Sequence, residues 1–265
     1  MIPLRDNIPS RTVPVMNYLM IAACAVVFFL QLGDEQDGRA DLVEGFGMVP
    51  KRISSPGEPV IIQEPKLARV RDQVGYVIVE RDLGPAAISP WLTMLTCIFL
   101  HGGWMHFLGN MWFLYIFGDN VEDRFGHLGY AIFYLASGVA ASVAHFATDP
   151  GSSVPTIGAS GAIAGVMGAY LLLYPRATVL SLVPILYVLR IIVLPAPIFL
   201  GIWFVMQLLQ GMSPGATGVA WWAHIGGFVV GAIVAALLSQ AHALRPPVAE
   251  RLPNTDHITS YRYRR

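Results

Sequence analysis

Two side chains in separate apolar segments have the chemistry of a nucleophile and its base. Ser160 lies among small residues at the start of an apolar segment that continues to Tyr174, and His224 lies at the start of another. A neutral imidazole is the side chain best suited to accept a serine proton near neutral pH. We therefore predict a Ser160–His224 dyad, because no acidic residue has a clear place as a third member.

His106 and Asn110 form a second candidate pair, four residues apart and therefore on one face of a helix. Both side chains can donate hydrogen bonds. With the backbone N–H of Ser160 at a helix start, they are suited to stabilise the oxyanion of an acyl-transfer reaction. These residue types together predict cleavage of peptide bonds.

Each of these residues also has a non-catalytic interpretation. Serines between glycines serve helix packing in membranes, and an intramembrane histidine or asparagine can be a hydrogen-bonded structural residue. A metal site at His101 and His106 is a further alternative, but their spacing suits one helical face poorly and no carboxylate or cysteine cluster joins them. We expect no metal and no cofactor, and we expect a structural role for His145.

The composition indicates a polytopic membrane protein. The chain of 265 residues has a mean hydropathy of +0.56 and only 13% charged residues, whereas soluble domains have about 25%. A formal net charge of zero gives no electrostatic case for a nucleic-acid partner. The two cysteines, Cys24 and Cys97, lie in apolar stretches and predict neither a disulfide framework nor a metal site.

Hydrophobic runs predict an all-α bundle of six transmembrane helices. The expected spans are 13–32, 104–117, 128–148, 158–174, 191–210 and 221–240. The first run covers about 30 Å as a helix and is interpreted as an uncleaved span. The segments 91–100 and 178–189 are interpreted as re-entrant or interfacial pieces.

The chain divides into a cytoplasmic N-terminal segment at 1–12, a membrane domain at 13–240 and a flexible cytoplasmic tail at 241–265. The membrane domain includes a long outer loop at 33–90. Within that loop, the sequence at 74–80 predicts a short strand, with 60–63 as a candidate partner.

Positive charges predict the orientation of the spans. With six spans, Arg124, Arg176 and Arg190 fall on the same side as the arginines of both termini, while the opposing short loops at 149–157 and 211–220 contain no Lys or Arg. Both termini should therefore be cytoplasmic. The candidate site residues then all lie near the outer ends of their helices, at similar depth.

Small residues give the fourth and sixth spans faces for close packing. Gly161 and Gly165 recur at four-residue spacing in one span, and Gly227 and Gly231 do so in the other. Such faces let two helix backbones approach closely in a membrane. The two spans can then come near enough for a hydrogen bond between Ser160 and His224.

At these residues the chain resembles the rhomboid family of intramembrane serine proteases. The resemblance covers about 13–240, and its matching motifs are GASG at 158–161, AHIGG at 223–227 with Gly231, HGGWMH at 101–106 through Asn110, FGDNVED at 117–123 and FGMVP at 46–50. It implies that Ser160 is the nucleophile and His224 the general base. It implies that His106, Asn110 and the Ser160 N–H form the oxyanion hole.

The resemblance also implies partners and a location. Substrates would be single-pass transmembrane proteins cleaved near the outer membrane face, entering through a gate formed by the fifth span and the loop before the sixth. The expected location is the bacterial inner membrane, in contact with lipid.

Two features depart from the family pattern. Many members carry an aromatic residue four positions after the nucleophile, where it stacks on the histidine, whereas this chain has Ala164 there. His224 must therefore be held in another way. The Trp-Arg pair that many members carry in the first loop is absent between 33 and 90.

The sequence leaves two other functional classes as alternatives. One is a rhomboid-like protein that binds membrane clients without cutting them, and the presence of Ser160, His224, His106 and Asn110 together argues against it. The other is a small transporter, a class that often shows repeated halves and paired intramembrane charges. No repeat is evident in this sequence.

Overall fold

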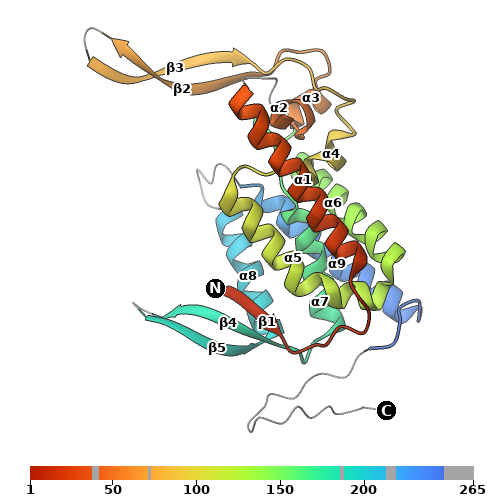
Figure 1. Ribbon diagram of the computed structural model, residues 1–265. Helices are drawn as coiled ribbons and strands as arrows, with labels where there is room; N and C mark the ends of the chain where they lie inside the picture. Colours follow the sequence, from red (N-terminus) through yellow and green to blue (C-terminus); the bar gives the residue numbers. More distant parts are fainter. Residues whose placement is uncertain (38–41, 71–72, 186–187, 213–218, 248–265) are drawn as a thin grey trace.

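The structure is a computed structural model that describes residues 1–37, 42–70, 73–185, 188–212 and 219–247. Most of these residues are helical, and the longer helices form one bundle (Figure 1). The bundle consists of α1 (Val15–Asp37), α5 (Trp104–Phe125), α6 (His127–Thr148), α7 (Ser160–Leu173), α8 (Ala196–Gly211) and α9 (Trp221–Gln240).

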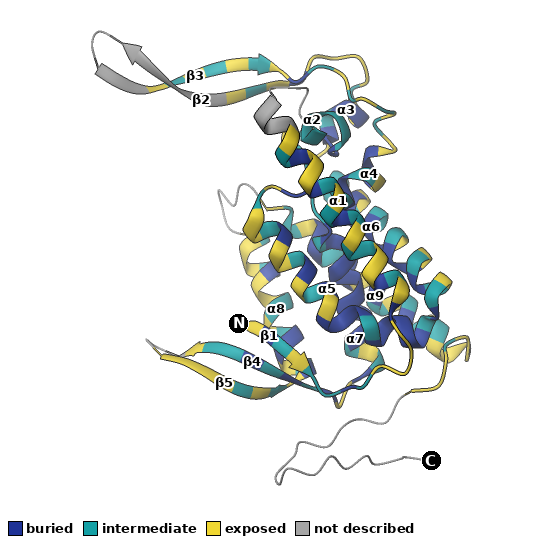
Figure 2. Ribbon diagram, viewed as in Figure 1, coloured by how far each residue is buried: buried dark blue, intermediate teal, exposed yellow. Residues whose placement is uncertain are grey.

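Helix α7 forms the centre of the bundle. It contacts α5, α6, α8 and α9, and every residue from Gly161 to Tyr170 is buried. The surrounding helices carry exposed apolar residues. Exposed positions are yellow in Figure 2, for example on α1. A helix that is apolar all round and buried on every side is expected at the core of a membrane bundle.

The backbones of α7 and α9 are in direct contact. A Cβ atom built on Gly227 would lie 2.1 Å from the carbonyl oxygen of Gly161, and one built on Gly231 would lie 2.0 Å from that of Gly165. No side chain fits at either position without moving a helix. The predicted close packing of these two glycine faces is therefore present in the structure.

Length and composition identify three helices that could cross a membrane among the described residues: α1, α6 and α9. Helices α7 and α8 are apolar but shorter, with 14 and 16 residues. At 1.5 Å per residue α7 is about 21 Å long, which is less than the thickness of a hydrocarbon core. The chain is thus a mostly helical membrane protein.

The second span was predicted to end at 117, but helix α5 continues to Phe125 and its acidic end is buried. Glu122 accepts hydrogen bonds from the backbone N–H groups of Met16 and Asn17, at 3.0 and 2.8 Å. Asp123 accepts bonds from the backbone N–H and hydroxyl of Thr12. Glu122 therefore satisfies free N–H groups at the start of α1, and Asp123 fixes the segment that leads into α1.

The prediction of an all-α fold was wrong, because the structure contains two sheets. Strands β1 (Ile2–Asp6), β4 (Thr178–Ile185) and β5 (Val188–Pro195) form an antiparallel sheet in the order β1-β4-β5. Residues 191–195, predicted as the start of the fifth span, therefore belong to a strand, and α8 begins at Ala196. Runs of β-branched residues such as those at 191–193 favour strands, and Pro195 cannot donate the hydrogen bonds of a helix interior.

The outer loop is ordered around a second hairpin. Strand β2 (Ile61–Val70) pairs with β3 (Gln73–Asp82), so the predicted strand at 74–80 is confirmed within a longer one. The short helices α2 (Leu42–Phe46) and α3 (Pro50–Ser54) pack beside the hairpin (Figure 1), and α4 (Thr93–Thr96) and the 3-10 helix η1 (Cys97–Phe99) replace the expected non-spanning piece. A bridge between Met48 and Thr156 ties this loop to the segment that leads into α7.

Two predicted features fall largely outside the described residues. The loop before α9, expected to form part of the gate, includes 213–218. The expected tail includes 248–265. The part of the tail that is described begins at the end of α9, where the Arg245 N–H donates to the Arg124 carbonyl at 2.8 Å.

The backbone contact between α7 and α9 makes a testable prediction. Gly231→Ala should lower the free energy of unfolding by about 1–3 kcal/mol, because the added methyl group overlaps the Gly165 carbonyl. Thermal unfolding of the purified protein in detergent measures the effect.

Gly201→Ala is the matched control. A Cβ on Gly201, inside α8, meets no atom within 4 Å. This variant should be neutral or more stable by about 0.5–1 kcal/mol. Equal unfolding temperatures for the two variants would contradict the packing that we describe.

Candidate active site

The structure brings Ser160 and His224 together in the first turns of α7 and α9. The Oγ atom of Ser160 lies 2.7 Å from Nε2 of His224. This is the distance of a good hydrogen bond, and the two residues are 64 positions apart in the chain. The arrangement allows the imidazole to accept the proton of the serine hydroxyl.

The glycine contact one residue further along explains this distance. Gly161 follows Ser160 directly, and its carbonyl lies against Gly227, three residues after His224. Because both site residues stand beside the point where the two backbones touch, their side chains need no long reach. A larger residue at Gly227 would meet this carbonyl and push the two helices apart, whereas one at Gly161 would meet Ala141 of α6.

The other ring nitrogen of His224 has a partner that the sequence reasoning missed. His224 Nδ1 lies 2.6 Å from Oε1 of Gln207, a buried side chain of α8. An amide oxygen only accepts hydrogen bonds, so Nδ1 carries the proton and Nε2 is free to accept one from Ser160. The available signal was a polar residue inside an apolar segment, but only the fold shows what it touches.

Two tryptophans flank the imidazole where the family pattern has an aromatic residue on α7. The ring centres of Trp203 and Trp221 each lie 6.0 Å from that of His224, with the Trp221 ring edge-on. Ala164 is buried and leaves no ring at the usual position. His224 is thus held from α8 and from its own helix.

His106 and Asn110 converge on the backbone just before Ser160. A Cβ built on Gly158 would lie 2.6 Å from His106 Nε2 and 3.7 Å from Asn110 Nδ2. Gly158 also has a positive φ of 122°, which side chains with a Cβ rarely adopt. The GASG segment therefore needs glycine at this position both for its turn and for the closeness of the two polar side chains.

Both polar side chains present hydrogen-bond donors. The Gly102 N–H donates to His106 Nδ1 at 3.3 Å, so in the neutral ring the proton is on Nε2, beside Gly158. Asn110 Nδ2 is buried and has no hydrogen-bond partner among the described residues. Unpaired buried donors are costly, and here they are placed to receive an oxygen that forms during a reaction.

His101 and His145 have different surroundings. The His101 backbone is held on both sides by the side chain of Gln31, and its ring packs edge-on against Phe107. His145 lies near the end of α6, with a buried Nδ1 that has no partner in the described part of the chain. No group of three His, Cys, Asp or Glu residues that could hold a metal occurs in that part.

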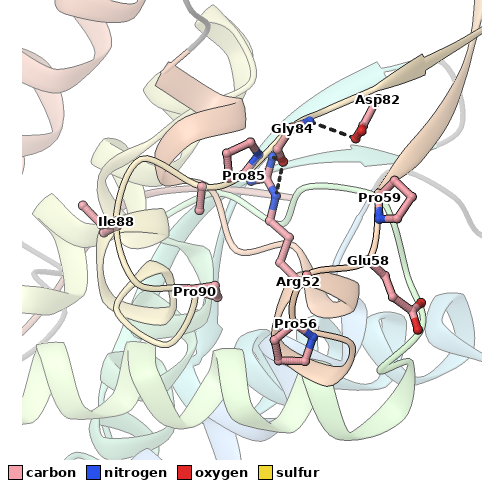
Figure 3. A pocket seen from close by; sticks show the side chains of 11 residues that line it. Arg52, Pro56, Glu58, Pro59, Asp82, Gly84, Pro85, Ile88 and Pro90 are labelled. Atoms are coloured by element: carbon pink, nitrogen blue, oxygen red, sulfur yellow. Dashed lines mark hydrogen bonds between the residues drawn. The ribbon is translucent and has the colours of Figure 1, made fainter.

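One cavity lies away from this site. It has a volume of about 360 Å³ and is lined by residues of the loop at 33–90, four of them prolines (Figure 3). Its polar groups already bond one another: Arg52 donates to the Gly84 carbonyl at 2.8 Å, and Asp82 accepts from the Gly84 N–H at 3.0 Å. These bonds tie the loop together.

The second cavity adjoins Ser160 and is nearly closed. It measures about 20 Å³ and is lined by Gly158, Ser160, Gly161 and Ala223, among others. A volume of this size accommodates about one water molecule. A peptide substrate therefore needs a movement of neighbouring helices to reach the serine.

Comparison with known proteins places these residues in a family context. The family model described as "Rhomboid domain" matches residues 89–241, a range that contains all four candidate side chains. "RHOMBOID-like protein 12, mitochondrial" from Arabidopsis thaliana is 32% identical over 158 residues, covering 53% of this chain and 44% of that protein. "Rhomboid protease GluP" from Bacillus subtilis (strain 168) is 33% identical over 158 residues, covering 60% and 24%.

A shorter match is closer in sequence. "Rhomboid-like protein 11, chloroplastic" from Arabidopsis thaliana is 40% identical over 76 residues, covering 29% of this chain and 27% of that protein. In each of these three cases the chain spans less than half the length of the relative.

Proposed function

This chain belongs to the rhomboid family, and we propose that it is a serine endopeptidase that cleaves transmembrane helices inside the membrane. The observation that carries the proposal is the 2.7 Å contact between Ser160 and His224, formed between the first turns of α7 and α9. Family membership implies an intramembrane serine protease as the general activity. The residues, the substrates and the membrane face are our own assignment.

In the proposed reaction Ser160 attacks the carbonyl carbon of the scissile bond while His224 Nε2 accepts the hydroxyl proton. The tetrahedral oxyanion is stabilised by His106 Nε2–H, Asn110 Nδ2–H and the backbone N–H of Ser160. His224 then gives its proton to the leaving amine, which breaks the C–N bond and leaves an acyl-enzyme. Water, deprotonated by His224, hydrolyses the ester and restores the serine.

We propose that all six long helices cross the membrane and that both termini are cytoplasmic. The first turns of α7 and α9, which carry Ser160 and His224, then lie toward the outer face. If Tyr174 is at the inner interface, Ser160 lies about 8 Å below the outer one, from the rise of the helix and the thickness of the core. Cleavage would occur near the outer end of a substrate helix.

Single-pass transmembrane proteins are the proposed substrates. The nearly closed cavity at Ser160 supports entry by displacement of a helix, and α8, which contacts α7 and α9, is the proposed gate. We place the protein in a bacterial inner membrane. The competing function is that of a protein that holds client helices without cutting them.

Labelling with a fluorophosphonate serine probe tests the nucleophile. Wild-type protein in detergent should be labelled, while Ser160→Ala should remove the reacting atom and His224→Ala the base that activates it. We expect the labelling rate of either variant to fall by a factor of at least about 10². This is the order of the contribution of a general base.

Ser181→Ala is the control, because Ser181 is another buried serine and its hydroxyl donates to the Val179 carbonyl within strand β4, away from the candidate site. It should label like the wild type. Undiminished labelling of Ser160→Ala would refute the assignment of the nucleophile.

A further inference from the structure

The contact between Gln207 and His224 joins the proposed base to a third helix. Ser160 and His224 stand on α7 and α9, whereas Gln207 stands on α8. Its side chain is buried, with 7% exposed, and its oxygen lies 2.6 Å from His224 Nδ1. Such a buried polar side chain costs free energy unless its hydrogen bonds are made.

We propose that Gln207 is a positioning residue that fixes the tautomer and orientation of His224. An imidazole with its proton on Nε2 could not accept from the serine hydroxyl, so catalysis requires the proton on Nδ1. The amide oxygen of Gln207 stabilises that form. The inference rests on the proposed function of Ser160 and His224 and extends it.

The position of Gln207 also couples catalysis to α8. The hydrogen bond exists only while α8 lies against α9, so displacement of α8 releases Nδ1. Trp203, one helical turn earlier, lies against the same imidazole and strengthens this dependence. The base is therefore assembled when α8 is in place and disturbed when α8 moves away.

Substitution of Gln207 tests the inference. Gln207→Met keeps the length and flexibility of the side chain but removes the acceptor. With a model single-pass transmembrane substrate in detergent, kcat should fall by about 10- to 100-fold and KM should change by less than about threefold, because the contact serves the chemical step.

Gln207→Glu should restore most of the activity, since a carboxylate also accepts from Nδ1–H. The charge would stabilise the protonated imidazole, so the acidic limb of the kcat profile should move to higher pH. Gln210→Met and Gln210→Glu are matched controls on the same helix, at an exposed position. They should leave both kcat and its pH profile as in the wild type.

The outcomes separate the two levels of the account. Wild-type kcat in Gln207→Met would overturn the role of Gln207 while leaving Ser160 and His224 in place. Equal losses in Gln207→Met and Gln207→Glu, with an unmoved pH profile, would show a merely structural residue and would also overturn it. A wild type that does not cleave would instead refute the proposed function.

A second observation, independent of the site, concerns the sheet at the other end of α7. Its β4–β5 hairpin has a strongly apolar sequence, and residues 178–195 contain one charged residue, Arg190. On one face, Leu189, Ile191 and Val193 are 65%, 62% and 54% exposed. The register places Leu182 opposite Ile191 on that face.

Near the base of the hairpin, the opposite face is covered by the bundle. Val179 and Ser181 are fully buried, and Leu194, the partner of Val179, packs against the main core. The hairpin thus presents a continuous apolar face away from the core. The hydrophobic effect disfavours leaving that face in water.

We infer that this exposed face binds the lipid of the membrane leaflet at that end of the bundle. The hairpin joins two apolar helices, and its face continues into exposed residues of α8 such as Ile198 and Ile202. In the sheet β5 is an edge strand with unpaired backbone groups, which favours the headgroup region over the hydrocarbon interior. Arg190 is suited to anionic headgroups there.

Site-directed fluorescence tests this inference. Ile191→Cys and, separately, Val193→Cys are labelled with an environment-sensitive fluorophore, and the protein is placed as one copy per nanodisc of phosphatidylcholine and phosphatidylglycerol. Cys24 and Cys97 are buried, which limits background labelling. Ile78→Cys, a 64% exposed strand position in the outer hairpin, is the control.

Spin-labelled lipid should quench the fluorophores at 191 and 193 at least about twice as strongly as the one at 78, and aqueous iodide should show the reverse order. Equal access of iodide to all three positions would overturn the inference. Protection that appears only when several copies share one disc would also overturn it, because a second copy of the chain would then be the partner.

Discussion

The contact between the backbones of α7 and α9 is the constraint on which the rest of the structure depends. Gly161 and Gly165 face Gly227 and Gly231 so closely that a methyl group at either of the latter would overlap a carbonyl oxygen. In a membrane no water drives helices together, so close packing of small residues must supply the attraction. The proposed nucleophile and base both stand within one turn of this contact, and it sets their separation.

Around that pair, two other helices contribute polar groups. Helix α5 brings His106 and Asn110 against Gly158, whose positive φ and missing side chain make room for them. Helix α8 brings Gln207 to the far side of His224. Glu122 at the end of α5 fixes the start of α1, and the Met48–Thr156 bridge fixes the segment before α7. Because the site is assembled from α5, α7, α8 and α9, movement of any one of these helices changes its geometry.

Much of the helical arrangement could be predicted from the sequence, because apolar length and glycine spacing act locally. The sixth predicted span has the same bounds as α9, and the close approach of Ser160 and His224 follows from the glycine faces beside them. The role of Gln207 could not be predicted, because an isolated glutamine in an apolar run gives no sign of its neighbour. The apolar run at 178–195 lacks the polar turn residues that distinguish a hairpin from a helix. Its pairing with β1 is seen only in the structure.

The most direct test of the central claim is to map the products of a single-pass transmembrane substrate in proteoliposomes by mass spectrometry. The account predicts a cut within the membrane segment, near the end of the bundle where Ser160 lies, and no product with Ser160→Ala. The same products from Ser160→Ala, or a cut confined to a segment outside the membrane, would contradict it.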